Sequence, residues 1–350
     1  MHAWLVRCQT IDQETFINTF ILLILLHLGH SGRSEMKVLQ EGRRSYPQDP
    51  TRNFDFRRFE DVCGDFLLVE GYIDFRELKN YPDERIVYLE FDEPNRFFSS
   101  DPNFNHFEYE GTLYKVFTLC PYTAKWLNAR YEDDKRVPIF FPFNEDHIPP
   151  VREKEFDVIY TGHILSRPIH KMLKDLRRYN YRIVSNSASP LVTDRGVSYS
   201  RKIDLISRSR VCLTHNLLFP RRKEVRNLQK IKDFKDNDAF RLVAGRTSME
   251  SIVGGVLGAG PVVPHIKSRV FEAAFCQSLI LCRNDSFNVI ENFFKPDREF
   301  IYFEPNELQD QLNDILRNFD SYSDIIRNAY NRATREYTTR AFVDRFLKNV

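Results

Sequence analysis

The chain has 350 residues, which at roughly 100–200 residues per domain suggests two domains. Its 51 Lys and Arg residues nearly balance 49 Asp and Glu residues, and a net charge of +2 gives no overall field that would point to nucleic acid. With 17 Pro and 13 Gly residues, the composition also excludes collagen and low-complexity chains. We therefore expect a globular protein with well-filled cores and no nucleic-acid partner.

The N-terminal segment differs from the rest of the chain. Its apolar run, 16–28, has 13 residues and is too short for the roughly 20 that span a bilayer. Asp12 and Glu14 precede this run and make a weak flank for a signal peptide. Met36 begins a sequence typical of a first strand. We interpret 1–35 as an N-terminal extension or an over-long start, with a membrane-associating helix and a cleaved signal as alternatives.

Short apolar segments closed by turn residues predict an α/β domain over 36–150. The expected elements are strands over 65–70, 85–91, 114–120 and 137–142 and a helix over 122–127. Glu70, Asp92 and Glu93 follow expected strand ends, and they are the candidate catalytic bases on the acceptor side. The charged segment 144–153 contains two adjacent prolines and is typical of a linker.

Strands and helices alternate from 151 to 325, which predicts a second α/β domain with a parallel sheet and helices on both faces. The expected strands span 156–161, 181–185, 211–215, 278–282 and 300–303. The expected helices span 166–178, 202–209, 269–276, 287–294 and 307–319. Residues 326–350 are expected to form C-terminal helices that pack back on the first domain.

A basic segment, 219–246, interrupts the alternation of the second domain. It has nine Lys and Arg residues against four Asp and Glu residues, which gives a local charge of +5. One interpretation is a solvated face, and the other is a patch that attracts an anionic acceptor or a lipid headgroup. Peripheral membrane contact through 16–28 or through this segment is therefore an alternative to a simple cytoplasmic location.

The cysteines and histidines show no metal-binding pattern. None of the six cysteines forms a CxxC pair, as expected for buried thiols in a cytosolic protein. His170, His215 and His265 lie far apart in the sequence, so we expect no metal site. No GxGxxG follows the first expected strand, which disfavours a nicotinamide-dependent enzyme.

The first candidate anion site follows the expected strand over 156–161. Gly162 allows a tight turn, and Ser166 can cap the helix that begins after it. The free N–H groups of that helix, together with Arg167, can hold a phosphate beside His163. An ordinary turn between a strand and a helix has the same pattern and remains the alternative.

The second candidate anion site surrounds the start of a later helix. Its residues gather just before that helix and in its first turn: His265, Lys267, Ser268 and Arg269. Cations placed there repel the positive end of the helix dipole unless an anion lies between them. Glu272 lies one turn inside and is placed to accept bonds from vicinal hydroxyls, as acidic residues do for ribose. An amphipathic helix start with Ser268 as its cap and a surface ion pair is the alternative.

Roughly residues 155–345 resemble a known family. The resemblance lies in the run from Arg269 through Glu272 to Gln277, in the segment 293–303 with its Glu299, and in the pair formed by Glu307 and Leu308. This pattern is similar to the C-terminal donor domain of family-1-type glycosyltransferases, in the CgeB-like branch. The strand over 157–162 is similar to the opening of the same domain.

The resemblance implies a GT-B fold, in which two Rossmann-like domains face a cleft and the C-terminal domain holds most of a nucleotide-sugar donor. By this resemblance, Glu272 holds the donor ribose. Lys267 and Arg269 face the diphosphate, while Gly162 and Arg167 line the same cleft. Such enzymes commonly need no metal or other cofactor, because cationic side chains and helix dipoles neutralise the leaving diphosphate.

The implied activity is transfer of a sugar from a nucleotide-diphosphate sugar to a glycan, lipid or protein acceptor. Two positions depart from the family pattern. Related retaining enzymes carry a Glu eight positions before the ribose Glu, where this chain has Pro264, and the Gly that usually follows Cys is Gln277. The first departure implies either a different residue near the anomeric carbon or a loss of activity, and the second predicts a slightly different helix end. Both departures favour the alternative, a non-catalytic GT-B-like nucleotide- or glycan-binding protein.

Overall fold

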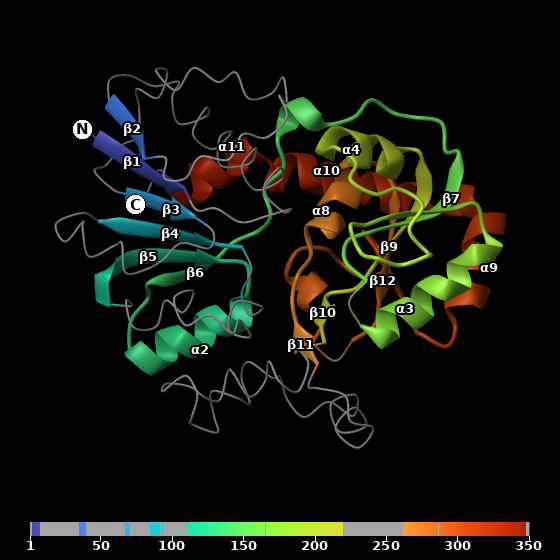
Figure 1. Cartoon of the computed structure of the whole chain (residues 1–350), viewed down its shortest axis with the longest axis horizontal. Helices are drawn as coiled ribbons and strands as arrows, with labels where there is room; N and C mark the ends of the chain where they lie inside the picture. The colour runs from blue at the N-terminus through green and yellow to red at the C-terminus, as the bar shows by residue number, and fades with distance from the viewer. Residues whose placement is uncertain are drawn as a thin grey trace. The chain divides into compact units, whose positions relative to one another are not determined.

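The computed structural model describes residues 2–7, 35–39, 67–70, 85–91, 93, 111–164, 166–219, 262–285, 287–347 and 350. Two compact units divide the chain, and each is built on a parallel sheet (Figure 1). The first unit comprises 1–140, 220–263 and 342–350, and the second comprises 141–219 and 264–341. The chain therefore passes from one unit to the other more than once, whereas the sequence pattern predicts contiguous domains divided at 150–151 and at 325–326.

The sheet of the first unit has six strands in the order β2-β1-β3-β4-β5-β6, paired in parallel throughout. Its strands are β1 (His2–Arg7), β2 (Glu35–Leu39), β3 (Leu67–Glu70), β4 (Ile86–Glu90), β5 (Leu113–Thr118) and β6 (Arg136–Pro138). Residues 2–7 pair with both β2 and β3, so they are an inner strand, although the sequence pattern places them in an extension. This strand has only six residues and precedes the longer apolar run 16–28, so the sequence does not single it out.

Apolar side chains fill the described part of the first unit. All five residues of β4 are buried, as expected for a parallel strand covered on both faces. Helix α2 (Pro121–Tyr131) begins after Cys120, whose Sγ accepts a hydrogen bond from the backbone N–H of Thr123. Near the end of the chain, α11 (Thr339–Phe342) leads into the π-helix η12 (Val343–Leu347). The rings of Phe342 and Phe346 pack against those of Phe117 and Phe140.

The sheet of the second unit has five strands in the order β13-β12-β9-β7-β8, again paired in parallel. Its strands are β7 (Phe156–Thr161), β8 (Tyr181–Val184), β9 (Ser209–Thr214), β12 (Leu279–Arg283) and β13 (Ile301–Phe303). A short ladder joins β10 (Leu217–Leu218) to β11 (Val263–Pro264). All five strands of the sheet lie where the sequence predicts them, within a residue or two at each end.

The helices of the second unit match the predicted ones less closely. They are α3 (Arg167–Lys174), α4 (Tyr199–Ser207), α8 (Ser268–Phe275), α9 (Leu308–Arg317) and α10 (Ser323–Glu336), with 3-10 turns η7 (Glu145–His147), η8 (Asp175–Arg178), η10 (Val289–Asn292) and η11 (Phe319–Tyr322). Helix α4 begins three residues before the predicted start, because Ser198 caps it. The helix predicted over 287–294 is only η10, since the Asp285 carboxylate binds the N–H groups of Phe287 and Asn288 and delays the start.

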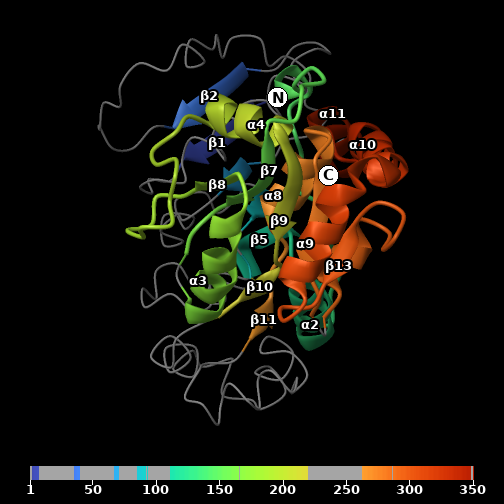
Figure 2. The same ribbon diagram turned by 90° about the vertical axis from the view of Figure 1, so that its right-hand side faces the viewer.

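Helices cover both faces of the second sheet. Side chains of α3 and α9 form one core with alternate residues of the strands, such as Val158 and Tyr160 of β7 and Val211 of β9. The intervening residues face α4, α8 and α10, which contact the sheet on its other side (Figures 1 and 2). This alternation is the period-2 pattern expected for strands buried on both faces.

The strand order creates a switch point between β7 and β9. After β7 the chain passes through α3 to β8 on one side, and then returns through α4 to β9 on the other side of β7. In open α/β sheets, ligands bind outside the carboxyl ends of strands at such a point. By this rule a ligand is expected beside Gly162 and His215, the residues that follow β7 and β9.

Within the described part of the chain, no helix has the length and apolar character needed to cross a membrane. The apolar run 16–28 and residues 220–246 of the basic segment lie outside the described residues.

Candidate functional site

The two candidate anion sites meet at the carboxyl end of β7. Gly162 has a φ of 123°, and a Cβ built on it would lie 2.1 Å from Nη2 of Arg269. The guanidinium therefore occupies the space that any other residue at position 162 would need. The sequence predicts that the turn around Lys267 and Arg269 faces Gly162, and the structure brings Arg269 to Gly162.

Arg269 is buried, with 7 % of its surface exposed, and it has no ion pair with any described carboxylate. Its guanidinium carbon lies 4.5 Å from the centroid of the Tyr160 ring, and its Nη1 has no hydrogen-bond partner among the described residues. A buried cation without a counter-ion is costly, and an anionic ligand at this point would offset that cost. This arrangement favours an anion site.

Asn216, just after β9, ties the loop before α8 to the same point. Its carbonyl oxygen accepts a bond of 2.8 Å from the N–H of His265, and its Oδ1 accepts one of 3.1 Å from the N–H of Lys267. The Lys267 ammonium also contacts Nδ1 of His265. These bonds fix the loop so that Lys267 and Arg269 enter the site from one helix start.

The electrostatics of the site are strongly positive. Burial lowers the pKa of His215 well below its ordinary value, and Arg269, Lys267 and Arg283 lower it further. Burial likewise lowers the pKa of His265, with Lys267 and Arg269 adding to the effect. Both histidines are therefore neutral at pH 7, mainly because they are buried, and the cations that lower their pKa further also attract anions.

Glu272 is 1 % exposed and lies one turn inside α8. Its Oε1 accepts a bond of 2.9 Å from the Nζ of Lys202 in α4, and its Oε2 is buried with no partner among the described residues. The carboxylate is therefore held in place by one cation and keeps an open acceptor. That acceptor is the group that the predicted ribose contact requires.

The other residues predicted to bind the donor, apart from His265, are less buried than Arg269 and Glu272. Ser166 caps α3 as predicted, accepting a bond from the N–H of Ile169, while Arg167 is exposed at the first position of that helix. His163 is exposed, and its carbonyl accepts a bond from Tyr160. Ser268 does not cap α8: Lys267 is the N-cap residue, without a side-chain bond, so the alternative of a capping serine is wrong.

The structure describes the three candidate bases of the first domain to different extents. Glu93 is buried and accepts a bond of 2.6 Å from the hydroxyl of Thr118, at the end of β5. Glu70 ends β3 in register with Leu89 of β4, but only its backbone is described. Asp92 lies outside the described residues.

Four site residues escape the sequence analysis: Tyr160, Lys202, His215 and Asn216. His215 and Asn216 directly follow a strand, which is the one signal that could have marked them. Lys202 and Tyr160 carry no such signal. The place of Lys202 depends on how α4 packs on α8, and that of Tyr160 depends on which face of the sheet its side chain takes in β7.

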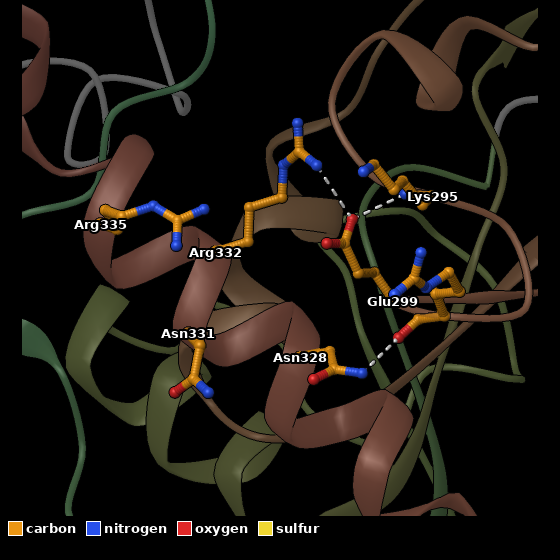
Figure 3. Close-up of a pocket in the computed structure, with 7 residues that line it drawn as sticks. Lys295, Glu299, Asn328, Asn331, Arg332 and Arg335 are labelled. Carbon is orange, nitrogen blue, oxygen red and sulfur yellow. Dashed lines mark hydrogen bonds and ion pairs between the residues drawn. The ribbon is translucent and has the colours of Figure 1, made fainter.

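The pocket drawn in Figure 3 lies elsewhere in the second unit, between α10 and the loop before β13. It has a volume of about 260 Å³, and none of the predicted donor residues lines it. Its one acidic residue, Glu299, is bound by Arg332 and by the backbone N–H of Lys295 (Figure 3).

Comparison with protein families places the second candidate site in a recognised domain. Residues 262–348 match the family described as glycosyl transferase-like. The chain carries a glycosyl transferase-like domain. Arg269 and Glu272 both lie within it, as does the loop tied to Asn216. A comparison with the curated proteins gives no match.

Solved structures share the fold of the chain beyond the glycosyl transferase-like domain. HepE from Anabaena with UDP-glucose aligns over 100 % of both chains, with a TM-score of 0.55 and 9 % identity. A glycosyltransferase from Rickettsia africae aligns over 99 % of this chain and 97 % of its own, with a TM-score of 0.53 and 11 % identity. TarM from S. aureus, in complex with fondaparinux, α-GlcNAc-glycerol and UDP, aligns over 81 % of this chain with a TM-score of 0.52 and 8 % identity.

The chain spans 55 % of the length of TarM. At identities this low, the likeness is one of fold. The fold is of the GT-B type, with two parallel α/β sheets, as the sequence resemblance predicts.

Proposed function

We propose that the protein is a glycosyltransferase that moves a sugar from a nucleoside-diphosphate sugar to an acceptor. The observation that carries the proposal is Arg269, a buried cation that has no carboxylate partner among the described residues and lies at the switch point of the second sheet. A diphosphate bound beside Gly162 supplies the missing negative charge. Related folds in HepE and TarM hold UDP, and HepE also holds UDP-glucose, which supports a donor of this class.

In this proposal, Lys267 and Arg269 bind the diphosphate and stabilise the charge that develops on it as the sugar leaves. The start of α8 adds N–H groups and the positive end of its dipole. Oε2 of Glu272 accepts a hydrogen bond from a ribose hydroxyl. Gly162, His163 and Arg167, which follow β7, border the donor. The remaining acceleration comes from holding donor and acceptor in a reactive orientation.

We further propose that the reaction needs neither a metal ion nor another cofactor. The support is chemical: a metal would add positive charge beside Lys267, Arg269 and Arg283, which already lower the pKa of His215. Turnover is then unchanged by a chelator such as EDTA. Loss of turnover with EDTA and its recovery with Mg²⁺ or Mn²⁺ would contradict this part of the proposal.

The acceptor side of the proposal rests on the carboxyl edge of the first sheet. Because parallel strands end at one edge, Glu70 and Glu93, which is bonded to Thr118, belong to that edge. Asp92 adjoins them in sequence. Any of the three that acts as base should, when changed to its amide, slow transfer while leaving donor affinity intact.

A second candidate function is binding without turnover. Pro264, eight positions before Glu272, is buried in the β10–β11 ladder and offers no carboxylate. A chain that only binds would take up the donor and release it unchanged. Product analysis separates the two functions, because only the enzyme releases free nucleoside diphosphate.

The decisive experiment screens nucleoside-diphosphate sugars by mass spectrometry and measures UDP and uridine affinity by calorimetry. We expect Arg269→Met to weaken UDP binding at least ten-fold, since a charge-assisted contact is lost, and to leave uridine binding unchanged. Arg177→Met, an exposed arginine of η8, serves as the control. No binding or turnover of any donor by the wild-type protein would overturn the proposal.

A further inference from the structure

The hydroxyl of Tyr160 joins the ends of two neighbouring strands. Its oxygen lies 3.1 Å from the carbonyl oxygen of His163 and 3.2 Å from Nε2 of His215. A phenol has one hydrogen and a carbonyl oxygen only accepts, so Tyr160 donates to His163 and accepts from His215. Nε2 of His215 must then carry a hydrogen.

The other ring nitrogen of His215 leads to the same assignment. The backbone N–H of Leu217 lies 3.4 Å from Nδ1 and donates to it, so Nδ1 carries no hydrogen. A ring with hydrogen on Nε2 alone is neutral. Neutrality also agrees with burial and with the nearby Arg269, Lys267 and Arg283, which lower the pKa of this histidine.

The ring of Tyr160 in turn supports the cation of the site. It lies 12° from parallel to the His215 ring, with centroids 6.0 Å apart, and the Arg269 guanidinium carbon is 4.5 Å from its centroid. A ring face stabilises a cation without accepting its in-plane N–H groups. The Tyr160 ring therefore holds Arg269 while the guanidinium N–H groups can still donate to a ligand. A carboxylate in the place of the ring would itself accept those hydrogen bonds.

We propose that Tyr160 and His215 are positioning residues, which together fix the Arg269 guanidinium and the turn at Gly162 and His163 for the donor diphosphate. The inference rests on the proposed function and adds to it. Neither residue needs to touch the donor. His215 fixes the Tyr160 hydroxyl, the hydroxyl fixes the His163 carbonyl, and the ring fixes Arg269.

The first test compares UDP with uridine as calorimetric probes of the full chain. Tyr160→Phe keeps the ring and removes the hydroxyl, so we expect about five-fold weaker UDP binding and unchanged uridine binding. Tyr160→Leu also removes the ring face, and we expect a loss of about ten-fold or more. Tyr181→Phe in β8 removes a hydroxyl that makes no bond to any described residue, and it serves as the matched control.

The histidine is tested by substitution and by NMR. His215→Gln can still donate an N–H from the position of Nε2, so it should bind UDP within about two-fold of wild type, whereas His215→Leu should resemble Tyr160→Phe. Imidazole ¹⁵N shifts at pH 7 should place the hydrogen of His215 on Nε2. A hydrogen on Nδ1, or UDP binding by Tyr160→Phe equal to that of wild type, would overturn the inference.

Failure of the proposed function appears in a different measurement. If the wild-type chain binds no nucleoside diphosphate at all, the proposed function and this inference both fail. If wild type binds UDP and the Tyr160 and His215 variants bind it equally well, only the inference fails.

Discussion

The guanidinium of Arg269 lies where a side chain at Gly162 would have to be, with Nη2 2.1 Å from the position of a Cβ. Gly162→Ala must therefore strain the backbone at φ 123° and also displace Arg269 from the Tyr160 ring. We expect UDP affinity to fall more than ten-fold and the protein to lose about 1–3 kcal/mol of stability. Calorimetry with UDP and urea unfolding measure the two effects.

The control for this prediction is Gly196→Ala. Gly196 has a φ of 62°, and nothing lies within 4 Å of a Cβ built on it. It therefore shares the strained backbone without the clash against Arg269. If Gly162→Ala and Gly196→Ala reduce UDP affinity equally, the contact between Gly162 and Arg269 has no part in binding.

Glu272→Gln tests the ribose contact. The amide keeps the size of the side chain and an acceptor for Lys202, but it loses the charge that makes Oε2 a strong acceptor. We expect UDP to bind about ten-fold more weakly and 2′,3′-dideoxy-UDP to bind as it does to wild type. Glu155→Gln removes a paired carboxylate that lies away from the site, and it is the control. An equal loss for both nucleotides would rule out a ribose contact.

Much of the second sheet follows from the sequence, because each strand is a short apolar run closed by a turn residue. The strand over 156–161 and its Gly162 turn are examples. The first sheet is harder to predict: residues 2–7 form a strand whose pairing with β2 and β3 no local pattern reveals. Helix starts depend on single caps, and the cap at Ser198 places the start of α4 three residues before the predicted one.

The residues of the candidate site also differ in how far the sequence predicts them. Lys267, Arg269 and Glu272 are recognisable because they cluster at one helix start, where local electrostatics indicate an anion. Tyr160 and His215 are not, since their meeting requires the order of β7 and β9 in the sheet, which is a non-local property. A sequence therefore reveals the charged groups more readily than the neutral groups that position them.

Gln277 explains one departure from the family pattern. It follows the C-cap residue of α8 and has a φ of 51°, the left-handed conformation that glycine favours at this position. The N–H groups of Gln277 and Ser278 donate back to the carbonyl oxygens of Ala274 and Ala273. The helix end therefore has the usual hydrogen bonds of a left-handed C-terminal cap, with glutamine in the position that glycine favours. Gln277→Gly should raise the free energy of unfolding by up to about 1 kcal/mol, measured in urea. Gln277→Ala keeps the strain, and an equal gain from it would contradict this account.

Lys154 joins two helix ends and gives the protein a pH-dependent stability. Its Nζ donates to the carbonyl oxygens of Ser207 and Gln277 at 2.8 and 2.7 Å, while burial lowers its pKa from 10.5 to about 8. Between these pH values the unfolded chain binds a proton that the folded chain does not, so raising the pH favours the folded state. Compared with Lys154→Met, wild type should therefore gain stability as the pH rises from 8 to 10, by no more than about 1.4 kcal/mol per pH unit.

Urea unfolding at each pH measures the difference in stability between wild type and Lys154→Met. Lys171→Met, which changes an exposed lysine of α3, is the control, and its stability difference from wild type should not change with pH. A constant difference between wild type and Lys154→Met would show that the amine titrates alike in both states.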